Sequence, residues 1–340
     1  GLLFYYVVVG LAVSFFSPAQ TVALYWGGLY LSPVLVIWMG MKKDDSLETI
    51  KRVIRINYVV CGGILLILLP GALEYGMPGT YRLMFYELPF GLGLIRSNGV
   101  ARFALVILII SVVRFILSRN MKKYAWAVPA AFSVYLFYQT QSRTALLGLA
   151  VAGVLLVHML GLRWQFLFLI PAASYVLYRV GFRERAHERF DELVSLTGRE
   201  FTWEQAIAQV KQSPFLGWGF HADRILLESQ HIHNSYLHAL MHGGIIGLAF
   251  FAAAVVSVWA VLLKNRILVR IRSGELARDV VLIESVLILG FLTARSFFES
   301  TAAFYGVDLL LFVPAAAYVY LYSLQPQSVK RSEWKMENGE

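Results

Sequence analysis

The sequence of 340 residues has few charged residues and a single cysteine. Only 15% of its residues are Asp, Glu, Lys or Arg, where an ordinary soluble domain has about 25%. Cys61 has no second cysteine to pair with, which excludes a disulfide framework within the chain. The sequence also lacks a P-loop and a GxGxxG motif followed by a carboxylate. These absences exclude an ordinary soluble domain, a disulfide-stapled domain and a soluble nucleotide-binding enzyme.

Apolar residues make up 58% of the chain, and the mean hydropathy is +0.64. They occur in runs of ~16–25 residues, close to the length that an α-helix needs to cross a hydrocarbon core ~30 Å thick. A membrane β-barrel would show short alternating segments instead. We therefore predict an all-α, polytopic transmembrane helix bundle. The ten predicted spans are roughly 2–16, 20–40, 56–72, 99–117, 124–140, 144–161, 164–181, 235–263, 279–295 and 303–323.

The net charge of +9 indicates topology here, because Lys and Arg collect in the cytoplasmic loops of membrane proteins. We predict no nucleic-acid partner. With a cytoplasmic N-terminus, most Lys and Arg residues fall in short cytoplasmic loops, and both termini are cytoplasmic. The predicted organisation is transmembrane helices over 1–181, an extracytoplasmic loop over 182–234, further helices over 235–323 and a cytoplasmic tail over 324–340.

The segment 182–234 is the one long polar stretch, and its pattern predicts a small helical cap. A charged helix over 182–193 is expected to lie along the membrane surface. Thr202-Trp-Glu-Gln205 has the form of a capping box at the start of a second helix. Ser213-Pro214 should end that helix. Its predicted apolar face consists of Trp203, Ala206, Ile207 and Val210.

Two arginines near the outer ends of the predicted spans are candidates for function, because charged groups are costly at membrane depth. Arg143 stands in the polar step Gln141-Ser-Arg143-Thr between two apolar spans. Arg199 lies three residues before Thr202, beside a helix N-terminus, and such a terminus favours anions. An arginine that extends to the water interface is the alternative interpretation of each.

Histidines cluster where the outer segment returns to the membrane, at His231, His233, His238 and His242. The i, i+4 spacing of His238 and His242 can bind a metal. No cysteine or close carboxylate in the sequence completes a zinc-like shell, so we predict no metal and no cofactor. A neutral imidazole that takes up a proton is the preferred interpretation, because histidine titrates near neutral pH. Interfacial packing and hydrogen bonding is the alternative.

Other charged residues lie close to or within the predicted spans. Arg295-Ser-Phe-Phe-Glu299 has the i, i+4 spacing of an ion pair at the outer end of the ninth span. Glu284 and Asp308 lie within apolar spans, where each is either a structural contact or a proton site. Three arginines surround a further outer loop, 73–98: Arg82, Arg96 and Arg102.

Arginines and a histidine on an outer face favour chemistry on a lipid pyrophosphate. The planar fork of arginine pairs bidentately with phosphate oxygens and stays charged when water is removed. A nearby histidine can deprotonate an acceptor hydroxyl as a general base. Outside the cytoplasm there is no ATP or nucleotide sugar, so the donor must arrive already activated. A glycan on a polyprenyl pyrophosphate meets these conditions.

Three sequence elements in the region 140–300 resemble the O-antigen ligase/polymerase superfamily. The first is His233-Asn234 followed, after nine residues, by Gly244-Ile-Ile-Gly247. The second, Arg-x3-Leu, is Arg143-Thr-Ala-Leu-Leu147. The third is an arginine followed by a tryptophan and then Pro-x-x-Gly-x-Gly, here Arg199, Trp203 and Pro214-Phe-Leu-Gly217-Trp-Gly219. All three occur in the family's order.

The resemblance implies a metal-independent, inverting glycosyltransferase of the bacterial inner membrane, with its active site on the periplasmic face. The donor would be a glycan on undecaprenyl pyrophosphate. The acceptor would be the lipid A core in a ligase, or a second lipid-linked glycan in an O-antigen or exopolysaccharide polymerase. The histidine would act as base or as orienting group, and the arginines would bind the pyrophosphate. The implied catalytic residues are His233, Arg199 and Arg143, and the implied substrate-binding residues are Arg143, Arg199, Asn234, Arg295, Glu299 and Trp203.

Family members have about twelve spans, so we expect helices to be missing before Gly1. Two other classes stay open. A secondary transporter would show internal repeats and broken helices near the midplane, and no such repeat is visible in this sequence. A non-catalytic component of envelope-polysaccharide assembly would tolerate His233→Ala and Arg199→Ala. Protein O-glycosylation by the same family is a further enzyme variant.

Overall fold

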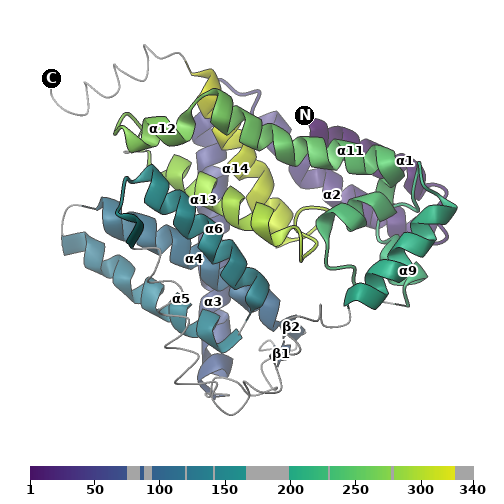
Figure 1. Ribbon diagram of the computed structural model, residues 1–340, viewed down its shortest axis with the longest axis horizontal. Helices are drawn as coiled ribbons and strands as arrows, with labels where there is room; N and C mark the ends of the chain where they lie inside the picture. Colours follow the sequence, from purple (N-terminus) through teal and green to yellow (C-terminus); the bar gives the residue numbers. More distant parts are fainter. Residues whose placement is uncertain are drawn as a thin grey trace.

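The computed structural model describes residues 1–74, 85–87, 94–118, 121–140, 142–165, 199–228, 230–276 and 279–325. Nearly all of the described part is helical (Figure 1). The elements are α1 (Leu2–Ser14), α2 (Gln20–Gly40), α3 (Ser46–Glu74), β1 (Phe85–Glu87), β2 (Leu94–Arg96), α4 (Ser97–Leu117), the 3-10 helix η3 (Met121–Trp126), α5 (Ala127–Thr140), α6 (Arg143–Met159), α9 (Arg199–Gln212), α10 (Ala222–Leu226), α11 (Ser235–Lys264), α12 (Ile267–Arg272), α13 (Val280–Arg295) and α14 (Val307–Leu324).

The all-α class is confirmed, with the addition of a small antiparallel hairpin in which Phe85 of β1 pairs with Arg96 of β2. Nine of the ten predicted spans correspond to helices. Five of the described helices are long and apolar enough to cross a membrane, namely α2, α3, α4, α11 and α14. The other four have 13 residues (α1), 14 (α5), 17 (α6) and 16 (α13). Each is shorter than the ~20 residues of a typical membrane-spanning helix.

Some predictions fall on residues that the structure does not describe. The seventh predicted span, 164–181, lies outside the described residues except for its first two positions. The charged helix expected over 182–193 lies outside them entirely, as does Arg82. These parts of the sequence interpretation therefore stay predictions.

Helix α13 forms the centre of the bundle. Every residue from Val281 to Leu292 is buried, which is expected of a helix that is apolar on all sides. Helices α4, α6 and α14 pack against it. Helices α1, α2 and α11 pack together on one side of α14, and α3, α4 and α5 pack in succession on the other side (Figure 1).

The outer surface of the bundle carries large apolar side chains. Phe16 is 87% exposed, Val59 75% and Val128 72%. Soluble monomers rarely leave extended apolar surface in water. Together with the five long apolar helices, this surface establishes a multi-pass membrane protein.

Both carboxylates within the predicted spans are paired with arginines. Glu284 accepts a hydrogen bond from Arg114 Nε at 2.7 Å. Asp308 is bound by Arg295 Nη1 at 2.9 Å and lies 3.3 Å from Arg102 Nη1. A buried charge is strongly destabilising without a partner. These contacts therefore support the structural interpretation of Glu284 and Asp308.

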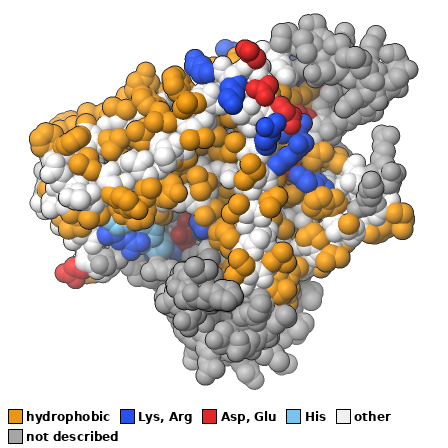
Figure 2. Space-filling view, turned by 180° about the vertical axis from the view of Figure 1, so that it is seen from behind, with side chains coloured by type: hydrophobic (Ala, Val, Ile, Leu, Met, Phe, Trp, Pro, Cys, Tyr) orange, Lys and Arg blue, Asp and Glu red, His pale blue; other side chains and the backbone are white. Residues whose placement is uncertain are grey.

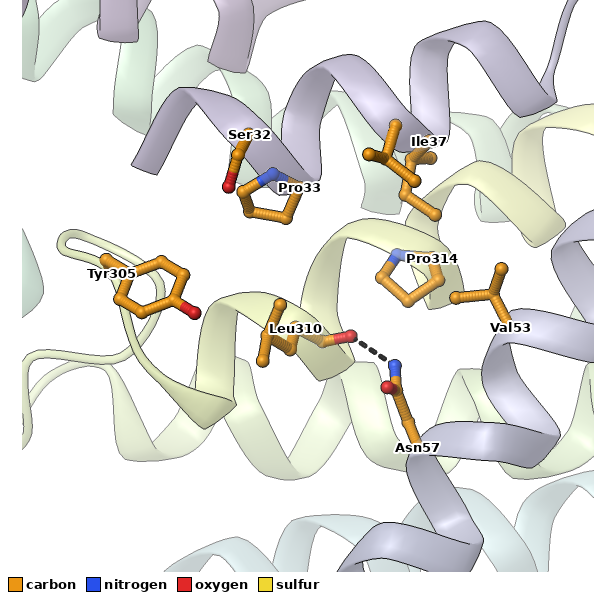
Figure 3. A pocket seen from close by; sticks show the side chains of 9 residues that line it. Ser32, Pro33, Ile37, Val53, Asn57, Tyr305, Leu310 and Pro314 are labelled. Carbon is orange, nitrogen blue, oxygen red and sulfur yellow. Dashed lines mark hydrogen bonds between the residues drawn. The ribbon is translucent and has the colours of Figure 1, made fainter. Parts of the chain in front are cut away.

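A cavity of about 240 Å³ between α2, α3 and α14 contains two helix prolines, Pro33 and Pro314. Proline has no N–H, so Pro314 cannot donate to the carbonyl of Leu310 one turn earlier. Asn57 Nδ2 of α3 donates to that carbonyl instead, at 2.6 Å (Figure 3). Tyr305 also lines the cavity. It belongs to the connection between α13 and α14, which carries part of the candidate site.

Candidate active site

Two glycine-containing motifs of the sequence meet at a bend in α11. Gly243 and Gly244 have non-helical backbone angles within this helix. The bend exposes carbonyl groups, and the cap segment donates hydrogen bonds to them. The N–H of Trp218 donates to the carbonyl of Met241 at 2.8 Å. The N–H of Gly219 donates to the carbonyl of His242 at 3.0 Å. The cap is thus attached to the membrane helix by backbone contacts.

Gly244 is required at this bend by both its backbone angle and its surroundings. Its φ is +60°, and an added Cβ would lie 2.2 Å from the backbone of Phe215. We expect Gly244→Ala to destabilise the protein by more than ~3 kcal/mol. Its backbone angles, φ +60° and ψ −158°, are essentially restricted to glycine, and overpacking adds to this strain. Gly161→Ala is a matched control, since its φ is +62° and no atom would lie within 4 Å of the Cβ. Thermal unfolding in detergent measures both, and equal losses would contradict the steric explanation.

The cap helix α9 differs at its start from the predicted capping box. It already includes Arg199, and the Thr202 hydroxyl donates to Gln230 Oε1 at 2.7 Å instead of capping the helix. The capping interpretation was therefore wrong, because tertiary contact with the chain before α11 recruits this hydroxyl. The helix ends at Gln212, before Ser213-Pro214, as predicted. Its buried face omits Ile207, which is 45% exposed.

The predicted catalytic histidine contacts a carboxylate that lies 66 residues away in sequence. His233 Nδ1 is 2.9 Å from Glu299 Oε2. Glu299 follows the end of α13, and Asn98 Nδ2 donates to its other oxygen at 2.8 Å. The Glu299 side chain is 8% exposed, and that of His233 is 21% exposed. His233 has a φ of +51°, a left-handed conformation that non-glycine residues adopt mainly where surrounding contacts impose it, often at functional sites.

Arg199 binds the same carboxylate from the cap. Its Nη1 donates to the carbonyl of Phe298 at 2.7 Å, and its Nη2 lies 3.4 Å from Glu299 Oε1. Two of the residues selected from sequence, Arg199 and His233, are therefore joined by a third, Glu299. Their spacing in sequence gave no indication of this contact.

The electrostatics of Glu299 determine which nitrogen of His233 carries hydrogen. Burial alone would raise the pKa of Glu299, but the hydrogen bond from His233 and the positive charges of Arg295 and Arg199 lower it to about 2. An ionised carboxylate can only accept hydrogen bonds. The hydrogen of the 2.9 Å contact therefore lies on His233 Nδ1, and in the neutral imidazole the lone pair is then on Nε2.

Arg295 does not form the ion pair with Glu299 that the i, i+4 spacing suggested. The ion pair that its guanidinium forms within the described residues is with Asp308, where Nη1 lies 2.9 Å from Oδ2. Its Nη2 donates to the carbonyl of Asn98 at 3.4 Å. Helix α13 ends at Arg295, and the N–H of Glu299 still donates to the carbonyl of Arg295 at 2.9 Å. The local backbone spacing is therefore kept, and the tertiary contacts with Asp308 and His233 decide how the two side chains pair. Arg295 instead contributes positive charge that lowers the pKa of Glu299.

Asn234 and Trp203 hold the backbone on either side of His233. Asn234 is the N-cap of α11, where its Oδ1 accepts from the N–H groups of Tyr236 and Leu237, each at 2.9 Å. Asn and Asp are favoured at this position for that reason. The indole N–H of Trp203 donates to the carbonyl of Ile232 at 2.6 Å. Their predicted contact with substrate stays a prediction.

Arg143 is the first residue of α6, after the N-cap Ser142. Its side chain is exposed. Helix α6 packs on α13 where Gly148 meets Phe291, and further along α6 Leu155 meets Gly290. The two helices run antiparallel, so Arg143 lies at the end of the bundle where α13 ends. Its role toward substrate stays a prediction.

His242 has a structural environment. The single O–H of Tyr6 donates to the carbonyl of Ala303 at 2.6 Å, so in the 3.0 Å contact between His242 Nδ1 and Tyr6 the histidine is the donor. The N–H of His221 donates to the remaining nitrogen, Nε2, at 3.3 Å. Both nitrogens of His242 are thus engaged within the protein. The i, i+4 pair with His238 therefore does not present two nitrogens to one metal ion.

Sequence reasoning missed Asp223, which lies in α10 of the cap. Its Oδ1 is 3.3 Å from His238 Nε2, and its Oδ2 is 3.5 Å from His231 Nδ1. The expectation that no carboxylate lies close to these histidines was therefore wrong. One ligand atom from each of the three residues lies within 4.8 Å of the others, so this group could hold a metal ion. The two adjacent charged residues Asp223 and Arg224 were the only indication of this site in the sequence.

Charged and histidine side chains gather in a hollow of the surface. Figure 2 shows histidine, Lys or Arg, and Asp or Glu side chains together in a recess at the lower left, below an area that is mostly hydrophobic. Within the described residues, the candidate site combines a histidine, a carboxylate and an arginine in hydrogen-bond contact, and Arg295 lies close by.

Comparison with known proteins gives two partial matches. Residues 128–252 match the family model described as O-Antigen ligase. This match covers less than half of the chain and shows a similarity to that family over the matched segment. A protein named O-antigen ligase from Pseudomonas aeruginosa is 32% identical over 145 residues, which cover 38% of this chain. The matched stretch spans 33% of that relative's length.

The part of the chain that matches the O-antigen ligase family contains Arg143, Arg199 and His233. Glu299 and Asn98 lie outside it, on the two sides of the matched segment. The candidate site is therefore assembled from the matched segment together with α4 and the connection that follows α13.

Proposed function

We propose that this protein is a membrane glycosyltransferase that moves a glycan from undecaprenyl pyrophosphate to an acceptor hydroxyl. The acceptor is the lipid A core, or a second lipid-linked glycan in a polymerase. The reaction takes place on the periplasmic face of the bacterial inner membrane. The family match supports a glycan ligase or polymerase role. The contact between His233 and the ionised Glu299 is the observation that carries the proposal.

The proposed mechanism begins with His233 as general base. Glu299 accepts the Nδ1 hydrogen and so keeps the lone pair on Nε2, which takes the proton from the acceptor hydroxyl. The acceptor oxygen then attacks the anomeric carbon from the side opposite the pyrophosphate. The bond between that carbon and the pyrophosphate oxygen breaks, and the configuration at the carbon is inverted. Glu299 stabilises the imidazolium that forms, as the carboxylate does in other His–carboxylate pairs.

Arg199 and Arg143 are proposed to bind the undecaprenyl pyrophosphate as it leaves. The described contacts of Arg199 use two of its five N–H donors, so others can bind phosphate oxygens. Guanidinium groups neutralise the negative charge that develops on the leaving group. In this proposal no metal ion acts at the reacting atoms.

The test of the function uses purified protein in nanodiscs with an undecaprenyl-pyrophosphate oligosaccharide. Glycan length is followed on a gel, with and without lipid A core. A ladder without core indicates a polymerase, and a single shift that requires core indicates a ligase. Failure to bind the donor at all would contradict the proposal. Donor binding without transfer to either acceptor would contradict both proposed acceptors.

Replacing Arg199 by Lys is expected to lower the transfer rate at least ~10-fold and almost as far as Arg199→Ala does. A lysine supplies one point charge and cannot reproduce the bidentate fork. The initial rate of glycan transfer at saturating acceptor measures the effect. Lys211→Arg, at the other end of α9, is the matched control. Wild-type turnover by Arg199→Lys would refute the fork as the binding element.

A further inference from the structure

A buried carboxylate outside the proposed reacting groups lies between two histidines. Asp223 is 1% exposed, and its two oxygens face different imidazoles, His238 at 3.3 Å and His231 at 3.5 Å. Arg224 Nε also lies close to it, at 3.9 Å. An unpaired carboxylate at this depth would be strongly unfavourable. The charge of Asp223 is therefore kept by its contacts with the two histidines and Arg224.

Each of the two histidines contacts a residue at the His233–Glu299 pair: His231 contacts His233, and His238 contacts the residue next to Glu299. The ring of His231 packs edge-on against the ring of His233, with centroids 4.7 Å apart. His238 Nδ1 lies 2.8 Å from the hydroxyl of Ser300, the residue next to Glu299. The ring of Phe304 packs against both His231 and His238, at 5.3 and 5.4 Å.

We propose that Asp223 is a positioning residue that holds His233 and Glu299 in register, through His231 on one side and through His238 and Ser300 on the other. The inference rests on the proposed function, because it concerns the geometry of the same His233–Glu299 pair. Asp223 belongs to the cap, whereas Glu299 follows α13, the central helix of the bundle. The alignment of the base with its carboxylate therefore depends on how the cap docks onto the bundle.

The test replaces Asp223 by Asn, which keeps the shape and removes the charge. We expect kcat to fall ~10- to 100-fold, because a small misplacement of a reacting group has an effect of this size. The KM for the lipid-linked donor should change less than ~3-fold, since Asp223 does not contact the donor in this proposal. Glu204→Gln removes an exposed carboxylate of the same cap and should leave kcat unchanged.

A second variant keeps the proposal testable if Asp223→Asn does not fold. Ser300→Ala cuts only the link from His238 to the residue next to Glu299, and we expect kcat to fall ~3- to 10-fold with the donor KM retained. If both single variants fold, the double variant should lose less than the product of the two single losses, because both act through one network.

Three results would overturn the positioning role. They are wild-type kcat in Asp223→Asn or Ser300→Ala, fully multiplicative losses in the double variant, and one equivalent of tightly bound zinc that Asp223→Asn removes. The last would make Asp223, His231 and His238 metal ligands instead. The activities of the wild type and of His233→Gln separate failure of the function from failure of the positioning role. No glycan transfer by the wild type refutes the proposed function, and normal turnover by His233→Gln refutes the role of His233 as base. An inactive His233→Gln beside a normal Asp223→Asn refutes only the positioning role.

Discussion

Replacing His233 by Gln is expected to lower kcat for glycan transfer ~10³-fold while donor binding is retained. Glutamine can still donate a hydrogen bond to Glu299, so the local packing is preserved. It cannot accept a proton from the acceptor hydroxyl, and general-base catalysis typically contributes ~10²–10⁴-fold. Transfer of a labelled glycan in single-turnover experiments measures the loss without interference from product release.

The matched control for this variant is His158→Gln. His158 lies in the last turn of α6, at the end opposite Arg143, and its replacement should leave the rate unchanged. A His233→Gln variant within threefold of wild type would contradict the role as base. Such a result would assign the proton acceptor to another group, because glycan transfer itself would still take place. A wild-type protein without any transfer activity would favour one of the non-enzymatic classes.

Replacing Glu299 by Gln is expected to lower kcat ~10²-fold. The amide group of glutamine can donate to His233 Nδ1, and this contact favours the tautomer that carries hydrogen on Nε2. That tautomer cannot take a proton from the acceptor, a loss that is large in other His–carboxylate pairs. Arg199 also loses its charged partner. Burst-phase transfer with a saturating donor measures the effect.

The control for this variant is Glu48→Gln at the start of α3, whose carboxylate pairs with Lys51 and Arg55 on the surface. Surface ion pairs contribute little, so its rate should be that of the wild type.

The pH dependence of the stability of the wild-type protein supplies a second check on Glu299. Because the pKa of Glu299 is about 2, its carboxylate stays ionised from pH 5 to 9. Its contribution to stability is present above the ordinary glutamate pKa and is lost as the pH falls toward about 2.

The membrane character of this protein could be predicted from sequence because it depends on composition and on the lengths of apolar runs. A helix in a bilayer satisfies its backbone hydrogen bonds internally, so each run specifies its element without information from its neighbours. The number of membrane-spanning helices does not follow from run lengths alone, because an apolar run can also form a buried core helix. Helix α13, with 16 residues, is short for a span, and the structure shows that it is the buried centre of the bundle.

The sequence by itself determined the fold class, and it predicted the cap and the roles of Arg143, Arg199 and His233, because these follow from local patterns. Only the tertiary structure decided how the residues are paired. Arg295 binds Asp308 and leaves Glu299 to His233, although the spacing favoured the local pair. Partners distant in sequence are selected by helix packing and by the bend of α11. Burial makes each unpaired charge costly, so this packing determines which pairs form.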